Sequence, residues 1–243
     1  MVEFKVPLVD LKERYQEEKE ELLSCIEKVL ESGNFVLTPE LTDFENNVAE
    51  YTKSKHCIGL NSGTDALMMG LMAMGIGKGD EVITSPISFI ATTAAIAHIG
   101  ATPVYVDVGK DQNIDPNKIV EKISSRTKAI MPVHWTGRIA DMQKISEIAA
   151  QHNLMIIEDS CQCMGAYYFG QHAGTFGTVG TFSGHPLKAM NAVGDAGFLI
   201  TDDEQIANKI RIYRNHGLID RDTCVEYGVK SRLDVLHASV SLY

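Results

Sequence analysis

Residues 57–74, CIGLNSGTDALMMGLMAM, pass directly from a short apolar run into a helical pattern. Residues 57–60 predict a buried strand, and residues 64–74 predict a helix that follows after a tight turn. The same alternation recurs, with further strands predicted at 81–84, 103–106, 129–131, 154–157 and 196–201 and further helices at 88–99, 115–123, 139–151 and 202–215. Short apolar strands separated by helices are typical of a parallel sheet that helices cover on both faces. We therefore expect an α/β fold with a mainly parallel sheet in three α/β/α layers.

The segments around this alternation have their own patterns. Apolar residues at helical spacing predict a helix from Leu11 to Ser32, which Gly33 ends, and Pro39 predicts the first turn of a second helix. The Gly/Thr-rich residues 174–184 predict short twisted strands and tight turns. Right-handed crossovers place the carboxyl ends of parallel strands at one edge, where open α/β sheets bind ligands. Polar residues that follow the predicted strands are therefore the candidates for a functional site.

The composition is that of a folded, acidic protein. The 243 residues are 44% hydrophobic and 22% charged, and the formal net charge is −10. An acidic chain without a Lys/Arg cluster is a poor partner for nucleic acid or an anionic membrane. No apolar run is long enough to cross a bilayer, and residues 1–5 lack the apolar region of a secretory signal, so we expect a cytoplasmic location. The five cysteines are scattered and odd in number, so we expect neither a disulfide framework nor a metal site.

The turn between the strand 57–60 and the helix 64–74 predicts an anion site. It contains Ser62, Gly63 and Thr64, which supply two hydroxyl groups and free backbone N–H groups at a helix N-terminus. A phosphate group suits such a turn, and an ordinary capped helix start is the alternative. No G-x-G-x-x-G motif is present, which argues against a nicotinamide dehydrogenase.

Two later clusters supply a carboxylate and an amine. Glu158 and Asp159 follow the strand 154–157 and therefore reach the ligand edge, where a solvated loop acid is the alternative. Most single lysines, such as Lys188, are surface charges, but a lysine in a dry pocket forms a Schiff base with a carbonyl. Together, an anion site, a strand-end carboxylate and a lysine are what pyridoxal phosphate requires. Phe89 follows another predicted strand and is placed to stack on the cofactor ring or to pack in the core.

With these residues in place, the chain resembles the DegT/DnrJ/EryC1/StrS family of sugar aminotransferases, which are pyridoxal-phosphate enzymes. The resemblance runs almost from end to end and depends on several motifs in the right order. These are VPLVDLKERY (6–15), LNSGTDAL (60–67), GDEVITSPISFIAT (79–92), IIEDSCQCMGA (156–166), GTFSGHPLKAMNAVGDAGFL (180–199), RNHG (214–217) and GVKSRLDVLHA (228–238). The resemblance implies an aspartate-aminotransferase-like large domain.

The resemblance also implies roles for the candidate residues. Lys188 matches the imine-forming and proton-transferring lysine of the family, and Asp159 matches the partner of the pyridine nitrogen. Gln162 matches the side chain beside the phenolic oxygen of the cofactor, and Phe89 matches the stacking aromatic residue. The phosphate-binding set comprises Ser62, Gly63, Thr64 and Ser183.

Histidines near these motifs are weaker candidates. His185 stands three residues before Lys188 and is a candidate for the substrate side of the pocket. His134 and His216 are also possible acids or bases. For all three histidines, a structural role is the alternative.

The activity that the resemblance implies is transamination. We expect a homodimer that transfers an amino group from L-glutamate to a keto group of a nucleotide-linked sugar, in cell-surface polysaccharide or deoxyaminosugar biosynthesis. A branch of the family in which histidine replaces the lysine dehydrates sugars instead, so Lys188 favours transamination. A cofactor-dependent sugar dehydratase and an inactive fragment that acts as an interaction module are the alternatives.

The sequence departs from the family pattern at three positions and in length. Lys230 stands where the family often has an asparagine that reaches the phosphate of the neighbouring subunit, and Val193 and Ala196 stand where Trp and Gly are frequent. The family continues into a smaller C-terminal domain, which this chain is expected to lack. We therefore expect an N-terminal helical segment (1–40), a pyridoxal-phosphate-binding large domain (41–230) and the start of the helix that leads to the C-terminal domain (231–243).

Overall fold

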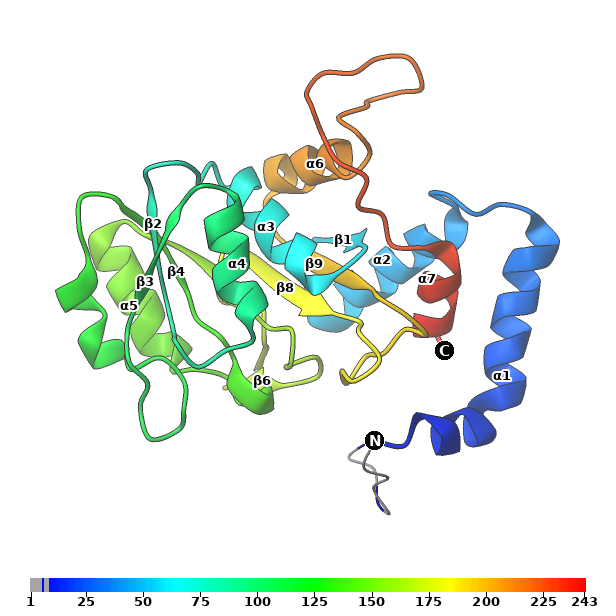
Figure 1. Cartoon of the computed structure of the whole chain (residues 1–243), viewed down its shortest axis with the longest axis horizontal. Helices are drawn as coiled ribbons and strands as arrows, with labels where there is room; N and C mark the ends of the chain where they lie inside the picture. The colour runs from blue at the N-terminus through cyan, green and yellow to red at the C-terminus, as the bar shows by residue number, and fades with distance from the viewer. Residues whose placement is uncertain (1–5, 7–8) are drawn as a thin grey trace, which may run out of the picture.

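The computed structural model describes residue 6 and residues 9–243, which form a central sheet with helices around it (Figure 1). The α-helices are α1 (Leu11–Ser32), α2 (Pro39–Thr52), α3 (Gly63–Ala73), α4 (Ile90–His98), α5 (Met142–His152), α6 (Glu204–Tyr213) and α7 (Val235–Ser241). The strands are β1 (His56–Leu60), β2 (Glu81–Thr84), β3 (Thr102–Tyr105), β4 (Thr127–Met131), β5 (Met155–Asp159), β6 (Tyr167–Tyr168), β7 (Gln171–His172), β8 (Val179–Ser183) and β9 (Gly197–Thr201). The expectations drawn from residues 1–5, and from residues 7–8 of the first family motif, lie outside the described residues.

The main sheet has seven strands in the order β1-β9-β8-β5-β4-β2-β3. Strands β3, β2, β4, β5 and β8 are parallel, whereas β9 is antiparallel to both of its neighbours, β1 and β8. The sheet is therefore mainly parallel, as the alternating pattern predicts. Its parallel strands end at one edge, which carries the loops that follow β2, β5 and β8.

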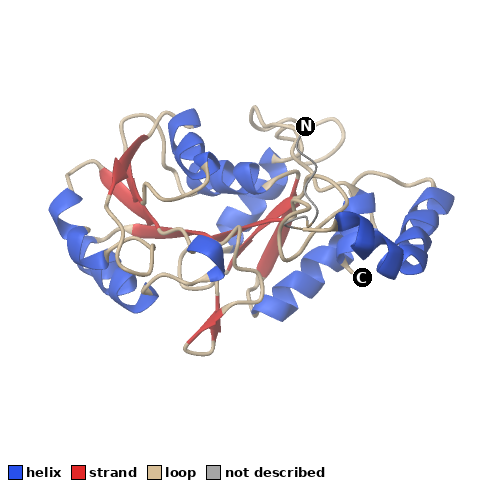
Figure 2. Cartoon of the chain, turned by 60° about the horizontal axis from the view of Figure 1, so that its bottom comes forward, coloured by secondary structure: helices blue, strands red, loops and turns tan. Residues whose placement is uncertain are grey.

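Helices cover both faces of the sheet (Figure 2). Because side chains alternate along a strand, neighbouring residues pack on opposite faces. Val82 belongs to the core formed with α3, α4 and α6, and Ile83 belongs to the core formed with α5. Helices α2 and α7 cover the sheet beside β1 and β9, where Phe44 packs edge-on against Phe198 with ring centroids 5.5 Å apart. The expected three-layer α/β/α architecture is confirmed.

The ends of the helices follow the signals in the sequence, with one exception. Gly33 ends α1 in the left-handed conformation with φ of 65°, and Pro39 is the first residue of α2. The helix predicted at 115–123 is instead two short 3-10 turns, Pro116–Lys118 and Val120–Lys122. The segment is short, and its β-branched residues lower helix propensity, so a continuous α-helix has little to stabilise it.

The first and last α-helices of the described chain lie side by side. α1 and α7 pack against each other, and Ser239 Oγ donates a hydrogen bond of 3.4 Å to the carbonyl of Cys25 (Figure 1). The division of the chain after residues 40 and 230 stays a prediction. None of the helices in the described part of the chain combines the length and apolar character that crossing a membrane requires.

Side chains bind the backbone groups of Gly59 at the outer edge of β1. The N–H group of Gly59 donates to Glu45 Oε1 at 2.8 Å, and Arg214 Nη1 donates to the carbonyl of Gly59 at 2.7 Å. Arg214, the first residue of the RNHG motif, also pairs with Glu45 and is almost fully buried. The motif therefore ties the end of α6 to β1 and α2. At the other edge of the sheet, β3 contains Pro103, which has no backbone N–H group.

Candidate active site

The ligand edge of the sheet and the N-termini of α3 and α4 enclose a cavity of about 490 Å³. The structure brings every candidate cofactor-binding and catalytic residue to the wall of this cavity. These residues are Ser62, Gly63, Thr64, Phe89, Asp159, Gln162, Ser183 and Lys188, with the substrate candidate His185 beside them. Residues from distant parts of the sequence therefore share one site.

The anion site forms at the first turn of α3. The Ser62 hydroxyl accepts a hydrogen bond of 3.1 Å from the Asp65 N–H and caps the helix. The N–H groups of Gly63 and Thr64 belong to the first turn, where helical N–H groups have no partner within the helix. They supply donors for an anion, which the positive end of the helix dipole also favours.

The turn lies against the strands that carry the other site residues, and glycine makes this contact possible. A Cβ atom on Gly63 would lie 2.8 Å from Cys161 Sγ and 2.9 Å from Ser183 Cβ. A Cβ atom on Gly197, in β9, would lie 2.1 Å from the carbonyl carbon of Ser62. Glycine is therefore required on both sides of this contact.

Asp159 ends β5 with its carboxylate held from two directions. Thr92 Oγ1, on α4, donates to Asp159 Oδ2 at 2.6 Å, and the Cys161 N–H donates to Oδ1 at 3.3 Å. Thr92 also makes a hydrogen bond of 2.5 Å with Ser88. Asp159 is only 6% exposed, so these contacts fix the orientation of a nearly buried acid at the wall of the cavity.

The neighbouring Glu158 lies on the opposite face of β5 and serves the fold. Glu158 Oε1 accepts hydrogen bonds from the N–H groups of Phe176 and Gly177, both at 2.7 Å. Oε2 accepts from the Gly174 N–H at 2.8 Å and from His134 Nε2 at 2.9 Å. Because His134 Nδ1 accepts the N–H of Ala140, the proton of this buried ring is on Nε2. His134 is therefore a structural residue and not part of the site.

Lys188 lies in the loop between β8 and β9. Its side chain is half-buried at the cavity wall, and its N–H donates to the carbonyl of His185 at 2.8 Å. His185 Nδ1 accepts the N–H of Leu187 at 3.2 Å, and Ser183 Oγ accepts the N–H of His185 at 3.3 Å. A short turn therefore presents Lys188 from the same strand end that carries Ser183.

Phe89 and Gln162 border the cavity from two further loops. Phe89 is 67% exposed at the N-terminus of α4, so its ring is free to cover a ligand and does not pack in the core. Gln162 Oε1 accepts the N–H of Thr136 at 3.0 Å. This bond ties the loop after β5 to the loop after β4.

Several residues at the cavity were not predicted from the sequence, and Ser88, Thr92, Cys161, Leu187 and Asp195 are among them. Thr92 follows Phe89 by three residues, so helical spacing places both on one face, and this was the available signal. Burial, followed by the nearby Asp159 carboxylate, raises the pKa of Cys161 well above its usual range. Cys161 is therefore a neutral thiol in the site at physiological pH. His216 and Lys230 do not line the cavity.

A cavity at the carboxyl edge of an α/β sheet, with an anion turn, a held carboxylate and a lysine, is typical of cofactor-dependent enzymes. Residues 16–243 match the model of the DegT/DnrJ/EryC1/StrS aminotransferase family, and the chain belongs to this family.

Individual relatives agree with this assignment. The chain is 40% identical over 237 residues to a dTDP-3-amino-3,4,6-trideoxy-alpha-D-glucose transaminase from Streptomyces venezuelae, covering 97% of this chain and 62% of the relative. The crystal structure of S. venezuelae DesV in complex with a ketimine intermediate superimposes with a TM-score of 0.95 at 40% identity, covering 98% of this chain and 64% of that chain. The crystal structure of NtdA from Bacillus subtilis with bound cofactor PMP gives a TM-score of 0.91 at 37% identity, covering 100% of this chain and 56% of that one. The chain thus spans less than two thirds of the length of each.

Proposed function

We propose that this chain is the cofactor-binding part of an aminotransferase that uses pyridoxal phosphate to move an amino group, from L-glutamate, to a keto group of a nucleotide-linked sugar. The observation that carries this proposal is the shared cavity. Lys188 and Asp159 both line it, and the anion turn at Gly63 and Thr64 lines it as well. The family and the transaminase relative from S. venezuelae support the same reaction class.

The residues at the cavity fit pyridoxal phosphate. The first turn of α3 and the Ser183 hydroxyl offer donors for the phosphate group. Asp159 is an acceptor held in place by Thr92, which suits a protonated ring nitrogen. The exposed ring of Phe89 offers a stacking surface, and Gln162 offers an amide for the phenolic oxygen. When bound, the cofactor supplies an electron sink for the carbon that loses a proton.

The protein's own part in the reaction is to bind, orient and move protons. The amine of Lys188 would hold the cofactor between turnovers and, once released, would act as the base. Its Nζ takes the proton from Cα of the amino donor. In the second half-reaction Nζ returns a proton to the sugar carbon that carried the keto oxygen. The Asp159 carboxylate, held by Thr92, would accept the N–H of the cofactor's ring nitrogen.

We also propose that the active form is a cytoplasmic homodimer acting in cell-surface polysaccharide or deoxyaminosugar biosynthesis. The cavity mouth carries the exposed apolar side chains of Phe89 and Leu187, which are 67% and 59% exposed. A second copy that covers them would remove apolar surface from water and close the site. Sedimentation of the purified protein tests the oligomeric state, and a monomer at all concentrations would contradict it.

The reaction is tested by absorbance and product analysis. Purified protein mixed with pyridoxal phosphate should develop a visible absorption band from the Lys188-bound cofactor, and Lys188→Ala should abolish it. Addition of L-glutamate should bleach the band as the cofactor takes up the amino group. A panel of keto-sugar nucleotides should then restore it and yield an amino sugar detectable by mass spectrometry.

A matched control and two other outcomes make the test decisive. Lys144→Ala, an exposed lysine on α5, should leave the band unchanged. Loss of water from a keto-deoxysugar without glutamate turnover would replace the proposal with a sugar dehydratase. The absence of any band from the unaltered protein would leave only an interaction module.

A further inference from the structure

The loop that carries Lys188 runs from residue 184 to residue 196, between β8 and β9. Two backbone hydrogen bonds close its base, from the Gly184 N–H to the carbonyl of Ala196 and from the Ala192 N–H to the carbonyl of Gly184, both 2.8 Å long. Within the loop, the N–H groups of His185, Leu187 and Lys188 bond inside the short turn described above. The position of this turn, and with it that of the Lys188 amine, also depends on the contacts that the sides of the loop make with neighbouring elements.

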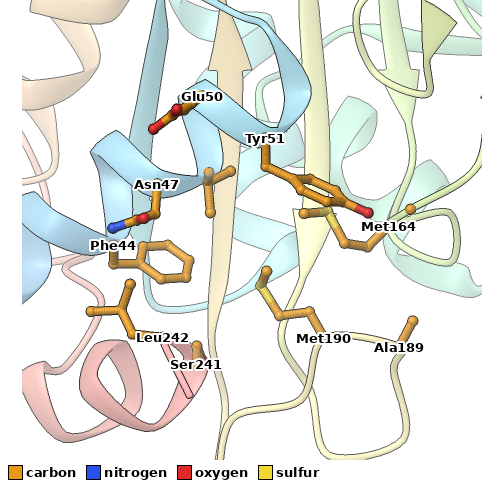
Figure 3. A pocket seen from close by; sticks show the side chains of 11 residues that line it. Phe44, Asn47, Glu50, Tyr51, Met164, Ala189, Met190, Ser241 and Leu242 are labelled. Atoms are coloured by element: carbon orange, nitrogen blue, oxygen red, sulfur yellow. The ribbon is translucent and has the colours of Figure 1, made fainter.

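One side of the loop is open. Ala189 and Met190 border a groove of about 630 Å³ that also lies against α2 and the end of α7 (Figure 3). Val193 is 53% exposed. Of these residues, only Met190 packs against the core cluster around Phe44 and Phe198, so this side of the loop has a single anchoring side chain.

The other side of the loop rests on α7. Ala192 is fully buried in a cluster with Ala238. Gly194 is so close to His237 that a Cβ atom would lie 2.7 Å from Nε2 and 2.8 Å from Cε1 of the imidazole ring. Gly194 is not among the residues with positive φ, so an alanine there would be strained by this contact and not by its backbone conformation.

The imidazole ring of His237 contributes to the contact with Gly194 through its size and shape. Its Nδ1 atom is buried without a hydrogen-bond partner in the described part of the chain. A buried polar atom without a partner is unfavourable, and an apolar side chain would avoid that cost. The role of the ring is therefore its fit against the backbone of the loop at Gly194.

We propose that His237 is a positioning residue: through its ring contact with Gly194, α7 sets the conformation of the 184–196 loop and thus the reach of the Lys188 amine. This inference rests on the proposed function for the role of Lys188, but the contact and its effect on the loop do not depend on it. The segment that ends the described chain is thereby part of the support of the cofactor site.

A double-mutant cycle tests the contact. Gly194→Ala adds a methyl group where the ring lies, His237→Ala removes the ring, and the double variant removes the overlap that the first change creates. Two readouts are followed: amide hydrogen exchange of residues 185–195 in the protein without cofactor, and the rate at which the absorption band forms with pyridoxal phosphate. Thermal unfolding verifies that each variant is folded, and His152→Ala, an exposed histidine on α5, is the control.

Each single variant should raise exchange in the loop and slow band formation by about tenfold or more, because a small displacement of a reacting group has large effects on rate. The double variant should recover most of the loss caused by Gly194→Ala. Unchanged exchange in both single variants, or effects that simply multiply in the double variant, would overturn the proposal. If the unaltered protein forms no band, the proposed function fails, while the exchange cycle still decides whether His237 positions the loop.

Discussion

Two adjacent carboxylates in β5 show how strand geometry separates structural from chemical roles. Glu158 is fully buried and accepts four hydrogen bonds on one face of the sheet, whereas Asp159 faces the cavity with the Thr92 hydroxyl and the Cys161 N–H as its partners. Side chains alternate along a strand, so one of two neighbouring acids must point away from the ligand. The structure assigns that position to Glu158.

The hydroxyl group of Thr92 is the first test at the scale of a single residue. Thr92→Val keeps the shape of the side chain but removes the 2.6 Å hydrogen bond to Asp159. Hydrogen bonds to charged groups contribute about 1.5–3 kcal/mol, so the affinity for pyridoxal phosphate should fall by roughly ten- to a hundredfold. Titration of the absorption band measures this change.

The next residue of the same helix supplies a matched control. Thr93 accepts a hydrogen bond from Tyr105 at the surface, away from the cavity. Thr93→Val should leave the affinity for the cofactor unchanged. Equal losses in both variants would show that the helix, and not the contact with Asp159, is responsible.

The reactivity of the cysteines is a second prediction at this scale. Burial raises the pKa of Cys57 and Cys161 well above the usual range and that of Cys163 to about 12. Thiolates are the reactive form, so these thiols should resist a disulfide reagent at about pH 8. The exposed Cys224 should react first, and Cys224→Ser should remove the fast phase of the colour change. Fast labelling of Cys161 would contradict the neutral thiol.

At the scale of elements, Glu158 joins β5 to the turn before β8. Glu158→Gln replaces one carboxylate oxygen by an NH₂ group, so either the N–H groups of Phe176 and Gly177 or those of Gly174 and His134 lose their acceptor. Buried donors left without partners cost about 1–3 kcal/mol each, so the free energy of unfolding should fall by about 3 kcal/mol or more. Urea unfolding measures it, with the exposed Glu147→Gln as a near-neutral control. A loss of less than about 1 kcal/mol would contradict the structural role.

The elements that the sequence predicted well are those whose burial is nearly complete. Residues 57–60, 81–84 and 129–131 are buried on both faces, so they are almost wholly apolar and stand out from the helices. The helix at 115–123 was wrong because its pattern does not distinguish a short α-helix from two 3-10 turns. The antiparallel direction of β9 was not predictable, since apolarity alone does not give the direction of a strand.

The residues of the candidate site were predictable where they belong to a sequence motif that is long enough to be recognised. Lys188, Asp159 and the turn at Gly63 lie together at one cavity, as the resemblance implied. Thr92 was missed because a threonine on a helix looks like any other helical residue until the tertiary contact is known. The contact between His237 and Gly194 joins residues far apart in the sequence, and no local pattern marks it.

At the scale of the whole molecule, His172 makes the free energy of unfolding depend on pH. Burial is the main cause that lowers the pKa of His172, and the neutral ring is held by the Gly165 N–H on Nε2 and the Ala173 carbonyl at Nδ1. The unfolded chain binds this proton near pH 6.5, so the stabilisation is present above about pH 6.5 and is lost as the pH falls through the lowered value. His172→Gln lacks the titrating group, so its stability should depend less on pH. Urea unfolding at about pH 7.5 and 5.5 measures this, and equal pH slopes would contradict it.

The backbone groups of the two edge strands, β1 and β3, affect how the protein behaves in a crowded solution. An open strand edge is a template on which another chain can add its own backbone and begin a fibril. Arg214 and Glu45 occupy the polar groups of Gly59 on one border, and Pro103 removes a donor from the other. Addition of another chain is therefore hindered at Gly59 on one border of the main sheet and at Pro103 on the other, so the RNHG motif also helps to keep this sheet from pairing with a second copy.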